Sequence, residues 1–404
     1  MVDHRLYWKE QVDHALNKGM KWVALFRRMA AVKKGVSPRM AKRLYFSIAL
    51  PSMLYAADVF LIPQHTTALA KKTRGSVGPT HRLSKVHRQA LLMITGGMRT
   101  TATDTMEAHS NVLPFHLLIN KMCHQATVRL CTLPLTHPLA KPIQKASRRY
   151  VKRHRSALHE LFQLYRLSPE HVETLTPARY PSRWNPHITL EIAENKEEAE
   201  KDEEKWKVRP GIRIYTDGSD FQGGVGASAA LYNSENRTWK TLRYYLGTSD
   251  QHTVYEAEIV GLILGMQLLR KERHVNLVSF AVDNQAALQA SRSWRPTSGH
   301  YLMDIFHGIK EDVRKKSELD NIFLRWVPGH NGIEGNELAD EEAKLATGGE
   351  EFSSSLVTLP KELRRTLPLS AAKLRQVHNA EIEEEAQDSW MQLQLQHFGA
   401  LLMN

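Results

Sequence analysis

Between residues 212 and 347, three strand-like segments follow one another along the chain, and helices then alternate with further strands. The strands are predicted from short apolar or alternating runs, at 212–216, 227–232, 238–246, 278–282 and 322–327. The helices are predicted at 252–273, 285–293, 301–316 and 336–347. Such an order predicts an α/β fold, in which a five-stranded mixed sheet carries helices on its faces. A Gly-rich turn is expected at 218–226, after the first strand.

A run of charged residues separates this part of the chain from what precedes it. Residues 191–207 read EIAENKEEAEKDEEKWK, a low-complexity sequence that is typical of a linker or an exposed helix. The tail of the chain is expected to hold one packing helix, at about 370–395. The predicted parts are a helical basic region at 1–185, an acidic linker at 186–208, the α/β domain at 209–348 and the tail at 349–404.

The first region is expected to be mostly helical. Apolar residues at helical spacing predict helices at 8–29 and 117–133. Pro38 stands at the first position of a further helix, which is expected to end at Pro51. The shorter features are a helix at 83–94, a loop at 75–79, and a basic cluster at 148–155 that is equally compatible with a solvated helix face.

The charge of the chain is distributed unevenly. The whole sequence carries 55 Lys and Arg against 43 Asp and Glu, a net charge of +12. Residues 1–185 alone carry +21, whereas residues 186–208 carry −4 and residues 209–404 carry −5. Segregated basic charge is typical of a protein that binds a polyanion, because Lys and Arg that neutralise phosphates release condensed counterions. Nucleic acid is therefore the expected partner, and a generic solubilising surface is the alternative.

The composition excludes several other classes of protein. The two cysteines, Cys123 and Cys131, are too few for a disulfide framework or a Cys-rich zinc module, and they suit a reducing compartment. The sequence has no run of about 18 apolar residues, and its N-terminal residues lack the apolar region of a secretory signal. We expect an intracellular protein, nuclear or cytoplasmic, that does not span a membrane. The sequence leaves protein partners open.

Four acidic residues stand where the predicted elements would bring carboxylates together. Asp217 ends the first predicted strand and Asp283 ends the fourth, and ligand sites in open α/β sheets lie at the carboxyl ends of strands. Glu258 lies in the long helix at 252–273, and Asp340 lies in the last helix of the domain. Clustered carboxylates repel one another unless cations neutralise them, and Mg²⁺ prefers such oxygen ligands. Two ions about 3.5–4 Å apart would stabilise the attacking and leaving oxygens of an in-line displacement at phosphorus.

Each of these residues also has an ordinary structural interpretation when it is taken alone. The sequence TDGS around Asp217 is typical of a plain turn, because Asp and Gly favour turns. Glu258 alone would be a solvent-facing helix residue, and Asp340 one acid of an acidic helix. The order, spacing and element context of the four together favour the metal site.

The motifs that carry the carboxylates resemble the type I ribonuclease H family over about 140 residues. They are YTDGS at 215–219, AE at 257–258, DNQ at 283–285 and GHNGIEGNELAD at 329–340. The resemblance implies a ribonuclease H-like sheet and hydrolysis of the RNA strand of RNA–DNA hybrids, leaving 5′-phosphate and 3′-hydroxyl ends. It also implies two Mg²⁺ ions as cofactors, with Mn²⁺ as an alternative ion.

The resemblance further implies roles for individual residues. The metal-binding and catalytic carboxylates are Asp217, Glu258, Asp283 and Asp340. His330, on a Gly-flanked loop, assists proton transfer or product departure, and a structural turn histidine is the alternative. The substrate-binding residues are Gly218, Ser219, Gln285 and Asn336. The first three match positions that contact the minor groove of the hybrid, where the 2′-hydroxyl distinguishes RNA from DNA.

The sequence departs from this family in two places. The frequent Asn four residues before the helix glutamate is Val254, which puts one hybrid contact in doubt, although Thr253 is kept. The long basic insertion that some free-standing members use to grip substrate is also missing. Its partial substitutes are Arg292, Arg295, Lys315 and Lys316. We therefore expect the basic first region to supply the grip.

The first region resembles the segment between polymerase and ribonuclease H in fungal non-LTR (LINE-type) retrotransposon polyproteins. The resemblance rests on SPRMAKRLYFSIALPSMLYAADVF at 37–60 and on LSKVHRQALLMITGGMRTTATDTMEAHSNVLPFHLL at 83–118. A reverse transcriptase needs adjacent metal-binding aspartates, and the sequence contains no Asp-Asp pair. Polymerase activity is therefore not expected, and the chain is interpreted as the C-terminal part of such an element.

Two other functions remain as alternatives. One is a catalytically silent nucleic-acid-binding remnant of a transposon, which the intact carboxylate set disfavours, because a decayed copy should have lost one carboxylate by chance. The other is a different nuclease of the same superfamily, such as an integrase or a proofreading exonuclease. Glu258 together with GHNGIEGNELAD disfavours this second alternative.

Overall fold

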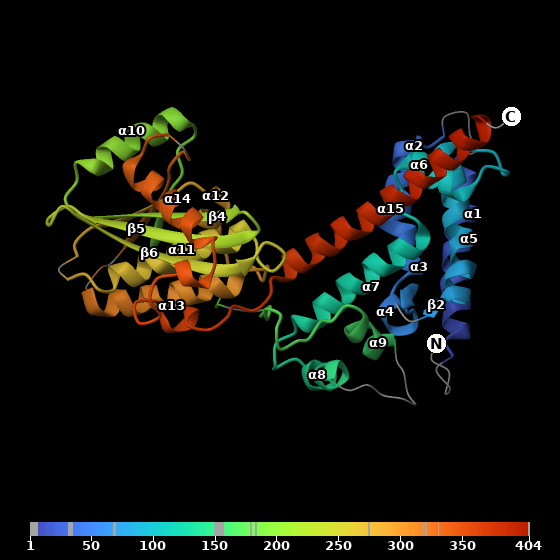
Figure 1. Ribbon diagram of the computed structural model, residues 1–404, viewed down its shortest axis with the longest axis horizontal. Coiled ribbons are helices and arrows are strands. Elements are labelled where there is room, and N and C mark those ends of the chain that lie inside the picture. The colour runs from blue at the N-terminus through green and yellow to red at the C-terminus, as the bar shows by residue number, and fades with distance from the viewer. Residues whose placement is uncertain are drawn as a thin grey trace. The chain divides into compact units, whose positions relative to one another are not determined.

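The chain divides into two compact units. The computed structural model describes residues 7–30, 35–67, 70–148, 157–177, 180–181, 184–273, 275–317, 319, 321–329 and 331–402. The helical unit comprises 1–131, 138–169 and 375–404, and the sheet unit comprises 132–137 and 170–374. Figure 1 shows helices alone over most of the first and a sheet between helices in the second. The predicted boundaries at residues 185 and 348 therefore fall inside the sheet unit.

The sheet unit is built on one mixed sheet of six strands. The strands are β3 (Ile188–Glu191), β4 (Ile212–Phe221), β5 (Gly224–Asn233), β6 (Thr238–Thr248), β7 (Val278–Val282) and β8 (Ile322–Trp326). Their order across the sheet is β3-β8-β7-β4-β5-β6. The pairs β3–β8, β8–β7 and β7–β4 are parallel, and β4–β5 and β5–β6 are antiparallel. The predicted α/β class and mixed sheet are confirmed.

Helices cover both faces of this sheet. The helices of the unit are α10 (Lys196–Lys207), α11 (Val254–Leu269), α12 (Gln285–Ala290), α13 (His300–Ser317) and α14 (Glu334–Ala346). Successive side chains of a strand point to opposite faces, so Ile214 meets Gly265 of α11, whereas Tyr215 meets Gly335 of α14. Helix α13 packs against the outer side of α11. Helix α11 therefore lies between the sheet and another helix, which explains why it is buried along nearly its whole length.

The sheet has one strand more than the five predicted, and this strand comes from the segment interpreted as a linker. β3 pairs with β8 in parallel from Ile188 to Glu191. Helix α10 follows, with the side chain of Asn195 accepting a hydrogen bond from the amide of Glu198 at 2.9 Å. A four-residue strand beside a charged run gives too little alternation to be predicted, because its burial depends on a partner strand far along the chain. Segment 186–208 is therefore part of the sheet unit.

The residues that follow α14 also pack into the sheet unit. The leucines that join its core are Leu359, Leu363 and Leu367. Ser354 covers the edge strand β6, and its amide donates to the carbonyl oxygen of Arg243 at 2.9 Å. Helix α15 (Ala371–Leu402) covers the helix predicted at 370–395, and from Arg375 onwards it belongs to the helical unit.

Contacts around Glu173 hold the beginning and the end of the sheet unit together, and we call them the joint at Glu173. The Glu173 carboxylate is fully buried and accepts hydrogen bonds from the amides of Gly299 at 2.7 Å and Ala371 at 2.8 Å. Burial raises the pKa of Glu173 despite these hydrogen bonds. Next to it, Val172 and Leu369 form a parallel β-bridge. The segments that lead into and out of residues 170–374 therefore lie side by side.

The helical unit confirms the prediction of a mostly helical first region. Its elements are α1 (Lys9–Ala30), α2 (Pro38–Leu44), a π-helix (Tyr45–Ala49), α3 (Leu50–Met53), α4 (Ala57–Phe60), the strands β1 (His65–Thr67) and β2 (Ala70–Arg74), α5 (Val77–Thr95), α6 (Thr103–Ser110), α7 (Phe115–Cys131), α8 (Ala140–Arg148) and α9 (Ala157–Leu164). Within the described part of the chain, no helix is both long and apolar enough to cross a membrane.

Two boundaries in the helical unit differ from the predictions, and both lie at prolines. Pro51 is predicted to end a helix, but it follows directly on the π-helix Tyr45–Ala49 and the chain stays helical across it. Pro79 is predicted in a loop but stands in the first turn of α5. Proline is tolerated at the start of α5 because its missing N–H would have no partner there. Most of the predicted basic cluster, residues 149–155, lies outside the described residues.

Candidate active site

Asp217 lies on the central strand β4, at the position where parallel pairing with β7 has just ended. The strand does not end there as predicted, because antiparallel pairing with β5 continues to Phe221. The hairpin turn is only Gln222–Gly223, and both residues have positive φ, as a tight two-residue hairpin requires. Asp217 is 7% exposed. Its carboxylate is therefore held on a rigid strand in a largely dry setting.

Glu258 lies in the second turn of α11, and the start of that helix is fixed by a capping box. The Thr253 side chain accepts from the Glu256 amide at 3.2 Å, and the Glu256 carboxylate accepts from the Thr253 amide at 2.9 Å. Gly218 lets the helix approach β4, since a Cβ there would stand 2.6 Å from the Glu258 amide nitrogen. Glu258 is 4% exposed and lies beside the strand that carries Asp217.

Asp283 follows directly after β7, whose parallel pairing with β4 brings it beside Asp217. The indole of Trp326 donates to the Asp283 carbonyl oxygen at 2.9 Å. Gly329 lies against the carboxylate itself, because a Cβ at that position would be 2.8 Å from Asp283 Oδ2. The next residue, Asn284, caps α12 by accepting from the Ala286 amide at 3.0 Å. Asp283 is thus held between the Trp326 indole, Gly329 and the capped start of α12.

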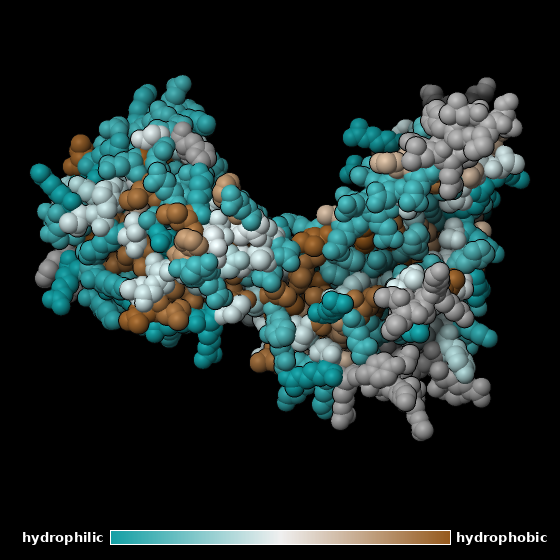
Figure 2. Space-filling model, in the orientation of Figure 1, coloured by the Kyte–Doolittle hydropathy of each residue, from teal (hydrophilic) through white to brown (hydrophobic). Residues whose placement is uncertain are grey.

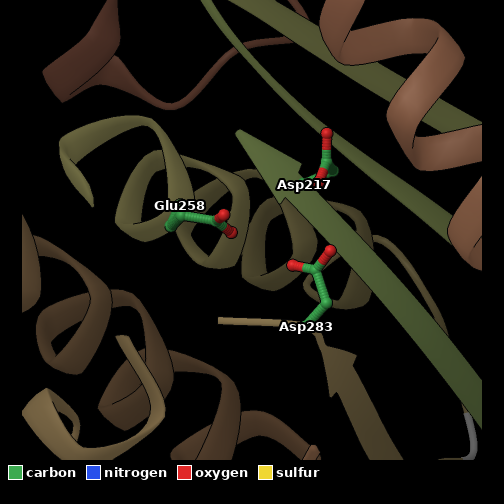
Figure 3. A group of neighbouring side chains, drawn as sticks. All are labelled: Asp217, Glu258 and Asp283. Carbon is green, nitrogen blue, oxygen red and sulfur yellow. The ribbon is translucent and has the colours of Figure 1, made fainter. Parts of the chain in front are cut away.

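The three carboxylates surround one space. Asp217, Glu258 and Asp283 each offer an oxygen within 4.8 Å of the others, and Figure 3 shows them converging from three elements. Burial, followed by repulsion from Asp283 and Asp340, raises the pKa of Asp217 to about 7. Burial, followed by repulsion from Asp283 and Asp217, raises the pKa of Glu258 well above its ordinary value. The Gly218 amide, Lys344 and Asn284 oppose these increases only in part, so the negative charge of the cluster is incompletely compensated.

These residues fit a hard divalent cation. All the donor atoms are carboxylate oxygens, which Mg²⁺ and Mn²⁺ accept as ligands. Glu258 Oε2 is buried without a hydrogen-bond partner among the described residues, although Asn284 Nδ2 reaches the other oxygen at 3.5 Å. An unpartnered buried carboxylate oxygen is costly unless a ligand or ion satisfies it.

Asp340 lies near this group but does not belong to the three that converge. It stands on α14 and contributes to the raised pKa of Asp217. Its own carboxylate pairs with Lys344 at 2.6 Å, one helical turn later. The hydrogen bond from Lys344 to Asp340 raises the pKa of the lysine. The fourth predicted carboxylate is therefore placed beside the site with a protein cation as its partner.

The predicted substrate-binding residues occupy different environments. Gly218 and Ser219 are half-buried on β4, and Gln285 is exposed at the start of α12. Asn336 is 3% exposed, and its Oδ1 has no hydrogen-bond partner among the described residues. Val254, the departure noted in the sequence, is 36% exposed at the first position of α11. His330 lies outside the described residues.

Several residues that shape the site were not predicted. They are Asn284, Trp326, Gly329 and Lys344. Asn284 and Gly329 stand inside motifs already singled out, and adjacency to Asp283 and His330 was the signal available for them. Trp326 acts through a contact between elements, which sequence spacing alone does not reveal. Lys344 stands four residues after Asp340 in the same helix, and this spacing was the signal available for it.

Comparison with known proteins places similarity on the segment that carries this site. A family model described as RNase H matches residues 209–347. Ribonuclease H of Legionella pneumophila (strain Corby) is 30% identical over 153 residues, covering 35% of this chain and 99% of that protein. The Pol polyprotein of Equine infectious anemia virus (isolate 1369) is 33% identical over 142 residues, covering 33% of this chain. The chain spans only 10% of that polyprotein's length.

Solved structures with similarity cover about a third of the chain. The structure of LC11-RNase H1 in complex with an RNA/DNA hybrid has 19% sequence identity and a TM-score of 0.27, covering 33% of this chain and 96% of that one. RNase H1 from Halobacterium salinarum NRC-1 has 16% identity and a TM-score of 0.26, covering 33% of this chain and 96% of that one.

Proposed function

Because this chain belongs to the ribonuclease H family through residues 209–347, we propose that it hydrolyses the RNA strand of RNA–DNA hybrids with the help of divalent metal. The observation that carries the proposal is the convergence of Asp217, Glu258 and Asp283, whose oxygens lie within 4.8 Å of one another. Asp217 and Glu258 are buried, and Asp283 is partly buried. The proposed products carry 5′-phosphate and 3′-hydroxyl ends.

Asp217, Glu258 and Asp283 would hold the metal, and Asp340 would join them by exchanging its contact with Lys344. Two bound Mg²⁺ ions, or Mn²⁺ in their place, would activate a water and neutralise charge at the scissile phosphate. The three carboxylates are fixed by β4, α11 and the end of β7. This rigidity orients the phosphodiester before any reaction begins.

Other residues of the chain would bind and orient the hybrid. Gly218 and Ser219 on β4 and exposed Gln285 on α12 adjoin Asp217 and Asp283 in sequence, and they are the proposed minor-groove contacts. Buried Asn336 would contribute through its unpartnered Oδ1. His330 is proposed to move a proton near neutral pH, as an imidazole can.

We also propose that the chain derives from a LINE-type retrotransposon and acts inside the cell, in the nucleus or cytoplasm. The resemblance of residues 37–60 and 83–118 to retrotransposon polyproteins supports this origin, and similarity to a viral Pol polyprotein is compatible with it. The alternative is a catalytically silent nucleic-acid-binding remnant. Retention of all four carboxylates favours the enzyme.

The proposal is tested by incubating the full chain with a labelled RNA–DNA hybrid and with matching RNA–RNA and DNA–DNA duplexes, with and without Mg²⁺. We expect cleavage of the RNA strand of the hybrid alone, and only with metal. Asp217→Asn removes charge but not shape, so it should abolish cleavage while the fold is kept. Cleavage by Asp217→Asn at the wild-type rate would falsify the assignment of the site. Hybrid binding without cleavage by the wild-type chain would favour the silent remnant.

A further inference from the structure

The turn at residues 331–333 stands, along the chain, between contacts to two of the carboxylates. At one end, Gly329 lies against the Asp283 carboxylate, because a Cβ there would be 2.8 Å from its Oδ2. At the other end, Ile333 is the N-cap residue of α14, the helix that carries Asp340. Gly332 has a φ of +69°, which favours glycine. A displacement of this turn would therefore disturb the surroundings of both carboxylates.

The turn is held from two directions. From within its own segment, the Gly332 amide donates to Glu337 Oε1 at 3.0 Å. From α10, Glu200 Oε1 accepts a hydrogen bond from Asn331 Nδ2 at 2.6 Å. The residues of α10 and the turn line a cavity of about 760 Å³. The Asn331–Glu200 hydrogen bond is thus a direct connection across a space that is otherwise open.

Helix α10 is firmly attached to the sheet, although most of its surface is charged. Figure 2 shows a hydrophilic surface over α10. On its buried side, Glu203 pairs with Arg325 of β8 at 2.6 Å and accepts from the Tyr215 hydroxyl of β4 at 2.6 Å. Separating the partners of a buried ion pair is strongly destabilising, so these contacts hold α10 in place on the sheet. The Tyr215 ring packs against Gly335, next to the same turn.

We propose that α10 positions the turn at 331–333 beside the carboxylate site, and that Glu200 is the positioning residue. The inference rests on the proposed function, because its consequence is catalytic. It assigns a role to a segment that precedes the part of the chain similar to ribonuclease H. Glu200 and Asn331 are both exposed, so their hydrogen bond contributes little to stability and its effect falls mainly on the geometry of the turn.

The experiment compares variants of the full chain in the hybrid assay with Mg²⁺. Glu200→Ala should lower kcat about 2- to 10-fold, which corresponds to an activation barrier raised by about 0.4–1.4 kcal/mol. The KM and Tm should stay unchanged. Asn331→Ala should have the same effect, and the double variant should show no further loss. Glu200→Gln keeps the acceptor oxygen and should restore kcat, which a purely electrostatic role would not allow.

Glu204→Ala is the matched control, because Glu204 is an exposed glutamate of the same helix that pairs with Lys207. It removes the same charge and should leave kcat unchanged. Hydrogen exchange of the peptide that spans the turn supplies a readout without activity. Exchange at the Gly332 amide should quicken in Glu200→Ala and not in Glu204→Ala.

Unchanged exchange in Glu200→Ala, or additive kcat losses in the double variant, would overturn the role of Glu200. The proposed function fails in a different way, through a wild-type chain that does not cleave or an Asp217→Asn variant that does. In that case the exchange measurement still decides whether α10 holds the turn.

Discussion

Two buried glutamates, one in each unit, illustrate how differently the same residue is used. Glu107 of the helical unit pairs with His87 at 3.0 Å, and His87 in turn meets the Tyr45 hydroxyl at 2.8 Å. Glu258 of the sheet unit faces two aspartates and leaves one buried oxygen without a partner among the described residues. A buried carboxylate with partners stabilises a fold, whereas one beside like charges costs stability until a cation binds.

The units also differ in net charge. The helical unit carries 29 Lys and Arg against 12 Asp and Glu, whereas the sheet unit carries 26 against 31. The carboxylates suited to phosphodiester chemistry lie in the unit with a net negative charge, which a polyanion would approach unfavourably. The basic unit can compensate by attracting the polyanion. The comparison therefore suggests that chemistry and electrostatic attraction are assigned to different parts of the chain.

The largest expected effect comes from neutralising the two glutamates. Glu258→Gln should lower kcat for hybrid cleavage by about 10²–10³-fold, the size of effect seen when one preorganised electrostatic group is removed from an active site. It should also raise the Tm in the absence of metal, because it relieves repulsion. Glu107→Gln should leave kcat unchanged and lower the Tm, because it weakens a satisfied pair. The measurements are steady-state kinetics with Mg²⁺ and thermal unfolding without it.

A Glu258→Gln variant that melts at a lower temperature than the wild type, and still cleaves, would break this comparison. Both glutamates would then serve the fold alone.

The second largest expected effect is on the affinity for a hybrid and on how that affinity depends on salt concentration. A fragment of residues 170–374 contains strand β3 and the buried leucines that follow residue 348. A fragment limited to residues 210–347 would lose both. We expect this fragment to bind a hybrid about tenfold or more weakly than the full chain at low salt. Its plot of log affinity against log salt should be shallower, by about 0.9 for each phosphate contact that the helical unit makes. Titrations of both proteins with one hybrid across a salt series measure both quantities.

If the fragment and the full chain had equal affinities and parallel salt slopes, the basic residues of the helical unit would not contact the substrate. That unit would then need another role.

The smallest effect is on stability as a function of pH. The pKa of Asp217 rises from 3.8 to about 7 on folding, so the folded state binds its proton more tightly than the unfolded state. Stability without metal should therefore fall as pH rises from about 4 to about 7 and then level off. Since one pKa unit corresponds to about 1.4 kcal/mol, Asp217→Asn should be more stable than the wild type above pH 7, by up to a few kcal/mol. Thermal unfolding in EDTA across this pH range measures the difference.

At pH 4 the two proteins should melt at nearly the same temperature, and Mg²⁺ at pH 8 should remove the advantage of Asp217→Asn. If the wild type and Asp217→Asn gave parallel curves of stability against pH, folding would not raise the pKa of Asp217.

Much of the site could be predicted because its residues stand in short motifs tied to strand ends. Asp217 and Asp283 follow from apolar strands, and parallel pairing brings such ends together. Residues that act through distant partners could not be predicted. Glu203 is one acid in a run of charges, and only its pairing with Arg325 reveals that it is buried. The motif around Asn336 predicts a substrate contact, yet the packing of α14 buries this residue.

The joint at Glu173 has a consequence for the order in which the chain can mature during synthesis. The two ends of residues 170–374 lie side by side, because Val172 and Leu369 form a β-bridge, so this unit resembles an insertion into the sequence of the helical unit. Ala371 must emerge from the ribosome before the Glu173 carboxylate gains that partner. One small cluster of the helical unit must wait longer still, because Leu117 packs there against Ile382 and Ala386 of the last helix. Part of the unit that is synthesised first is therefore completed last.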